Sequence, residues 1–128
     1  MSRQLKKSSA DFNLDLSYLQ DVANGSNEFM IEMMEMFLKQ TPGYFEQLDQ
    51  LIKDENWPVV ADISHKIKPS LTFMGIESAR VSLDEIEHNA RNLKNLETIT
   101  PAFKILKEMS EQLFIKLAQV KSDLEKTV

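Results

Sequence analysis

The sequence predicts an all-α protein, an up-down-up-down four-helix bundle with a short N-terminal helix packed on it. Apolar residues recur at the three- and four-residue spacing of amphipathic helices, and no alternating strand pattern bounded by turns is present. The chain has only three glycines and four prolines, and most of them fall where helices should begin or end. Short connections between long amphipathic helices favour a bundle in which successive helices run antiparallel.

The N-terminal half predicts two helices, and a break after the second at which a new helix begins. The segment "DLSYLQDVA" is typical of a short first helix. Ser26 is a suitable N-cap for a second helix that runs to about Gln40. Thr41 is a capping residue and Pro42 follows it at the first position of a new helix, so we expect the chain to break and restart there as "GYFEQLDQLIKD".

The C-terminal half predicts three further helices. Asn56 can cap a helix that begins at Trp57, and Gly75 can end it. The segment "IESARVSLDEIEHNARNL" has the periodicity of the next helix. Thr100, followed by a proline, opens a last helix that extends to about Lys126.

Composition restricts the kinds of function that the chain can have. Its net charge of −5 disfavours a nucleic-acid surface. The absence of cysteine excludes disulfides, thiolate metal ligands and a cysteine nucleophile. No signal peptide or membrane-spanning run is apparent. We therefore expect a cytoplasmic monomer in which residues 1–12 form a flexible tail and residues 13–128 form one helical domain.

His65 is one of two histidines, and its helix should direct it toward solvent. At about 100° per residue, His65 lies about 160° from the core position Ile67. One turn away on either side are Ala61 and Pro69, which are too compact to cover the imidazole. This arrangement suits a nucleophile that must meet a partner's reactive group. The alternative, to which the residues give equal weight, is an ordinary surface histidine above a simple proline kink.

Charged neighbours separate His65 from His88, which also points outward. Lys68 follows His65 by three residues and shares its side of the helix, so it can attract an anion. Lys66 is a further cation nearby. The neighbours of His88 form an acidic surface that would repel a phosphate or carboxylate: Asp84, Glu85 and Glu87. The pattern favours His65 as the functional histidine.

The stretch "SHKIKPSLTFMG" resembles the signature of histidine phosphotransfer (Hpt) domains. In that signature an exposed helical histidine is followed by an aliphatic residue, a lysine, a small residue and a serine or alanine, and a glycine closes the helix. The matching positions are His65, Ile67, Lys68, Pro69, Ser70 and Gly75. The upstream stretch "DLSYLQDVANGSNEFMIEMMEMFLKQTP" is similar to the first two helices of the family. The resemblance covers residues 12–124, with Pro69 in place of the usual glycine.

The resemblance implies a phosphocarrier of a two-component phosphorelay. His65 would accept a phosphoryl group from a receiver-domain aspartate and pass it to another receiver, while Lys68, together with Lys66, would offset the phosphoryl charge. The implied partners are response-regulator receiver domains and a hybrid histidine kinase. The chain has no glycine-rich ATP loop. We therefore expect no cofactor of its own and no autonomous enzyme activity, with Mg²⁺ supplied by the receiver during transfer.

The second predicted helix also suggests a docking surface. Its core stripe comprises Phe29, Met30, Met33, Met36 and Phe37. Ile31, Met34 and Leu38 widen the apolar arc around this helix beyond what a bundle helix needs. Methionine-rich surfaces of this kind adapt to partners. The predicted docking residues are Ile31, Met34, Leu38, Ala61, Pro69 and Thr72. Alternatively, the first helix covers this excess through Leu16, Tyr18 and Leu19.

Two other functions remain as alternatives. One is a non-catalytic helical interaction module in which His65 is incidental. The other is a di-iron bundle, which needs inward-facing Glu-x-x-His pairs. Glu85 and His88 have that spacing, but both point away from the predicted core, and the sequence has no second such pair.

Overall fold

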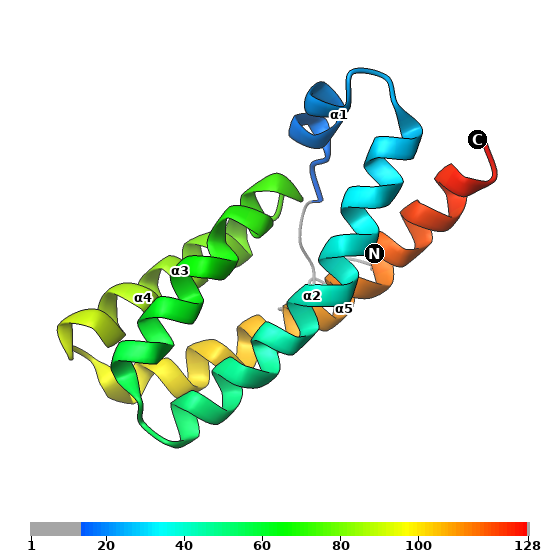
Figure 1. Ribbon diagram of the computed structural model, residues 1–128. Helices are drawn as coiled ribbons and strands as arrows, with labels where there is room; N and C mark the ends of the chain where they lie inside the picture. The colour runs from blue at the N-terminus through cyan, green and yellow to red at the C-terminus, as the bar shows by residue number, and fades with distance from the viewer. Residues whose placement is uncertain (1–13, 128) are drawn as a thin grey trace, which may run out of the picture.

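The computed structural model describes residues 14–127, and most of this range is helical, with short connections between the helices (Figure 1). A short helix, α1, is followed by four long ones. The elements are α1 (Ser17–Ala23), α2 (Asn27–Lys53), α3 (Trp57–Phe73), α4 (Glu77–Asn92), the 3₁₀ turn η1 (Leu96–Thr98) and α5 (Ile99–Glu125). The predicted tail, residues 1–12, lies outside the described residues. No helix within residues 14–127 has the length and apolar character needed to cross a membrane.

The four long helices form the predicted bundle, and successive helices run in opposite directions (Figure 1). Helix α3 packs mainly against α4, and α2 packs mainly against α5. Contacts of α2 with α3 and of α4 with α5 close the bundle. The predicted fold class is therefore confirmed, including the short N-terminal helix, which packs against α2.

Helix α2 does not break at Pro42, so the predicted restart there is wrong. It continues through Thr41 and Pro42 to Lys53. A proline in a helix removes one backbone hydrogen bond, which would favour a break in an isolated peptide. Here Phe37 and Phe45, on either side of Pro42, are both buried in the same core. The parts of α2 before and after Pro42 thus bury side chains in one core, and this burial offsets the free-energy cost of the proline within the helix.

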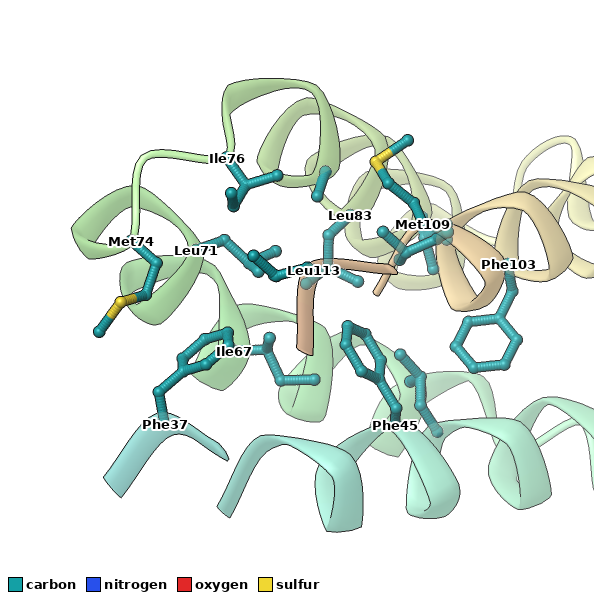
Figure 2. Packing of buried hydrophobic residues seen from close by; sticks show 14 of the residues in the cluster. Phe37, Phe45, Ile67, Leu71, Met74, Ile76, Leu83, Phe103, Met109 and Leu113 are labelled. Atoms are coloured by element: carbon teal, nitrogen blue, oxygen red, sulfur yellow. The ribbon is translucent and has the colours of Figure 1, made fainter. Parts of the chain in front are cut away.

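The core contains aliphatic and aromatic side chains from all four long helices. Figure 2 shows Phe37 and Phe45 of α2 directed toward Ile67 of α3, with Phe103 of α5 beside Phe45. The rings of Phe45 and Phe103 lie 6.3 Å apart between centroids, within the range of favourable aromatic pairs.

The face of α2 that packs inward differs from the predicted stripe. Met30 and Phe37 are buried as expected, but Met34 is fully buried and Met36 is 49% exposed. Met34 therefore cannot offer a docking surface, and that prediction is wrong. The apolar arc of α2 is wide enough for the helix to face the core in several rotations about its own axis. Packing against α3 and α5 selects the rotation that buries Met34.

Gly75 joins α3 to the N-terminal segment. Its φ of +74° lies in the left-handed region, which glycine adopts without steric cost. The Asp15 amide donates to the Gly75 carbonyl over 3.2 Å, and a Cβ at Gly75 would overlap the Asp15 carbonyl group. This close approach places α1 at the end of α3, where the Tyr18 and Phe73 rings meet edge to face at 5.6 Å.

Candidate functional site

His65 lies in the middle of α3 and faces the seam with α4. Its side chain is 71% exposed, and Nδ1 lies 3.1 Å from Oε2 of Glu87 on α4. The Glu87 side chain is only 12% exposed. The imidazole is thus held at one nitrogen by a mostly buried carboxylate, while the rest of the ring is open to solvent.

Glu87 is ionised at neutral pH despite its burial. Burial alone would raise the pKa of this carboxyl group, but hydrogen bonds from Lys68 and Arg91 and the positive charge of Lys68 hold it below its usual value. An ionised carboxylate can only accept a hydrogen bond, so Nδ1 of His65 must carry the ring proton in this contact. A neutral imidazole then has its free lone pair on Nε2.

Lys68 shares this side of α3, as predicted, but it is not a free cation. Its Nζ lies 2.6 Å from Oδ1 of Asp84 and 2.6 Å from Oε1 of Glu87, and its side chain is 20% exposed. The hydrogen bonds that Lys68 donates to Asp84 first and then to Glu87 raise the pKa of Lys68 above its ordinary value. Lys68 therefore secures Glu87, which contacts His65, together with Asp84.

In the structure, two of the three acidic residues predicted to surround His88 contact α3 instead. Asp84 and Glu87 point across the seam toward Lys68 and His65, so the acids adjoin the functional candidate. His88 itself contacts only its own helix in the hydrogen bonds that the structure shows, through Asn92. Periodicity along α4 could not reveal this, because it says nothing about which residues of α3 lie opposite.

Arg91 is a further cation at the site, and the sequence analysis missed it. Its guanidinium lies 3.4 Å from Oε2 of Glu87 and 3.4 Å from Oδ1 of Asp62 on α3. The side chain is half exposed. One signal was available, since Arg91 follows Glu87 by four residues and so shares its helix face. Its contacts are longer than those of Lys68, so it is the more loosely held cation.

The other predicted site residues fall in different places. Lys66 leans toward α2, where its Nζ lies 5.6 Å from the centre of the Tyr44 ring, so it does not join His65 and Lys68 on the α4 side. Ala61 is completely buried, and its prediction as a docking residue is wrong, because α3 turns this position into the core. Pro69 and Thr72 are exposed.

An apolar groove of about 270 Å³ lies between α2 and α3. Pro69 forms part of its wall and sits one turn after His65 on the same helix. The lining residues are Met33, Met36, Phe37, Gln40, Thr41, Pro69, Ser70, Phe73 and Met74. Ile31 and Leu38, both partly buried, do not line it.

A family model, the Hpt domain, matches residues 32–122 of the chain. The match covers most of the chain and includes the whole of α3 and α4. The chain belongs to the Hpt domain family. No curated protein and no solved structure matches it. Membership implies a histidine phosphotransfer role in a phosphorelay and interaction with receiver domains, and Hpt domains are phosphocarriers rather than catalysts.

The di-iron alternative finds no support in the part of this Hpt domain that the structure describes. Glu85 and His88 are both exposed. Within residues 14–127, no three histidine or carboxylate side chains gather closely enough to hold a metal ion.

The carboxylate cluster predicts a pH dependence of stability. The pKa values of Asp84 and Glu87 are lowered in the folded state. Their contribution is therefore present above their unfolded pKa values, near 4, and is lost as the pH falls through the lower folded values. We expect the urea midpoint to fall between pH 6 and pH 3, and to fall less in Lys68→Met. An equal fall in both proteins would contradict the role given to Lys68.

Proposed function

We propose that Nε2 of His65 accepts a phosphoryl group from the aspartate of a receiver domain and passes it to a second receiver. The observation that carries this proposal is the hydrogen bond between His65 Nδ1 and the ionised Glu87. It leaves the lone pair on Nε2, in a ring that is open to a partner. In the transfer, the Nε2–P bond forms while the bond between phosphorus and the aspartyl oxygen breaks, and the aspartate leaves as a carboxylate.

Charge at the seam supports this reaction. Bond formation at Nε2, with the proton retained on Nδ1, gives the imidazole ring a positive charge. Glu87 lies 3.1 Å from Nδ1 and offsets that charge where it develops. Arg91 is half exposed and held by two long contacts, so it can turn toward phosphoryl oxygens. Lys68 contributes mainly by keeping Glu87 in place.

The α2–α3 groove is the proposed receiver-docking surface. It is apolar, it borders Pro69, and Met36 leaves a flexible thioether exposed within it, which suits a surface that adapts to partners. Ile31, Leu38 and Thr72 do not line this groove, so a docking role for these three residues stays a prediction from the sequence. The proposed partners are response-regulator receivers and the receiver of a hybrid histidine kinase, which would bring the Mg²⁺.

A direct transfer assay tests the function. A receiver charged with acetyl phosphate is mixed with the purified chain, and acid-labile phosphate on each protein is followed over time. We expect phosphate to appear on the chain at His65 and to move onto a second, uncharged receiver. Receiver binding without phosphate uptake would support the alternative of a non-catalytic interaction module.

Replacing Glu87 by glutamine is expected to slow phosphoryl uptake by roughly 10-fold or more, because the amide carries no charge to offset the ring and no longer requires the proton on Nδ1. Phosphorylation reactions quenched at a series of times measure the rate of phosphoryl uptake. Glu85→Gln is the matched control, since Glu85 is an exposed carboxylate on the same helix, and it should transfer normally. Equal rates in the two variants would remove Glu87 from the mechanism.

A further inference from the structure

Methionine is the oxidisable residue type of this chain, which has no cysteine and seven methionines. Within residues 14–127 the methionines differ sharply in exposure. Met30, Met34, Met74 and Met109 are buried, and Met33 is partly buried. Met36 is 49% exposed and is the only one of these that is exposed. Among the methionines of residues 14–127, an oxidant in solution therefore reaches the Met36 sulfur first, and the chain has no thiol to intercept it.

The position of Met36 gives its oxidation a consequence. Met36 lines the groove between α2 and α3, whose wall also contains Pro69, one turn from His65. Its neighbours in the groove include Phe37 and Phe73, so a partner that fills the groove must bury the thioether against apolar surface. The side chain lies at the rim of the bundle, and its chemistry can change without opening the core.

We propose that Met36 is a modification site through which a peroxide slows phosphotransfer, an inference that rests on the proposed function. The thioether sulfur attacks one oxygen of hydrogen peroxide and the O–O bond breaks. The proton on the attacked oxygen passes to the departing oxygen, which leaves as water. Sulfur is oxidised by two electrons to the sulfoxide, and the peroxide is reduced. The product is polar and bulkier than the thioether.

A sulfoxide in the groove opposes docking of a receiver. Its oxygen is a strong hydrogen-bond acceptor, and the lining beside it consists mainly of methionine, phenylalanine and proline side chains. Burying a polar group without a partner is costly. We expect receiver affinity to fall about 5- to 100-fold, while the helical content and the reactivity of His65 toward solution reagents stay as before.

The test uses the full chain, oxidised with dilute hydrogen peroxide that is removed before a charged receiver is added. Peptide mass mapping should place one added oxygen on Met36, and receiver binding and phosphoryl uptake should fall together. Treatment with a methionine sulfoxide reductase should restore both. The ratio of treated to untreated uptake should stay near one in Met36→Leu, and should fall as in the native chain in Met109→Leu, the buried control on α5.

Two results would overturn the proposal. One is complete oxidation of Met36 with unchanged receiver binding and uptake, and the other is an equal loss in Met36→Leu. Either result leaves the phosphotransfer function intact, because the untreated chain still accepts phosphate. An untreated chain that takes no phosphate from any receiver would overturn the proposed function itself, and this inference with it.

Discussion

Replacing His65 by glutamine is expected to abolish phosphoryl uptake. The variant loses the lone pair of Nε2, and no other histidine lies in the seam between α3 and α4. The fold should remain, because the side chain is mostly exposed and Glu87 is its only hydrogen-bond partner within residues 14–127. A glutamine amide can donate to the same carboxylate. The free energy of unfolding should change by no more than about 0.5 kcal/mol, as for most surface substitutions.

His88→Gln is the matched control for this prediction. His88 is the other histidine, it is exposed, and it hydrogen bonds within α4 to Asn92. Its replacement should change neither uptake nor stability. Acid-labile phosphate on the His65 variant, measured after mixing with a charged receiver, would show that the nucleophile has been assigned to the wrong residue.

The second large effect is structural, and it is expected at Gly75. A Cβ there meets the Asp15 carbonyl group, and the residue must keep a φ of +74°. Gly75→Ala should lower the free energy of unfolding by about 2 kcal/mol or more, since left-handed backbone alone costs a non-glycine residue roughly 1–2 kcal/mol. Moving the N-terminal segment away does not avoid the penalty, because it would expose Leu19, which is fully buried, at a cost of about 1.5–3 kcal/mol.

Gly43→Ala provides the opposite case within the same chain. Gly43 lies inside α2, and apart from its chain neighbours and the adjacent backbone of its own helix no atom lies within 4 Å of a Cβ placed on it. Alanine is favoured over glycine in a helix by about 0.5–1 kcal/mol, so this variant should be more stable. Urea unfolding of both variants measures the difference. A Gly75→Ala protein as stable as the native chain would mean that α1 does not dock on α3 as described.

Local signals determined the helices and the direction in which His65 points. Ser26 caps α2 as predicted, with its hydroxyl accepting from the Phe29 amide over 3.1 Å, and Gly75 follows the end of α3. The outward direction of His65 follows from Ile67 and Leu71, which are buried on the other side of the helix. These features depend on dihedral preference and on a helical period, which a single segment contains within itself.

The tertiary structure decided what lies beside His65. Helical periodicity tells which side of a helix faces the core, but the residues that meet across a seam depend on how two helices are rotated and offset along their axes. Only packing could therefore place Glu87 against Nδ1 of His65 and bring Asp84 to Lys68. Packing also decided that α2 continues past Pro42 and that Met34 is buried, because both outcomes depend on apolar surface that other helices supply.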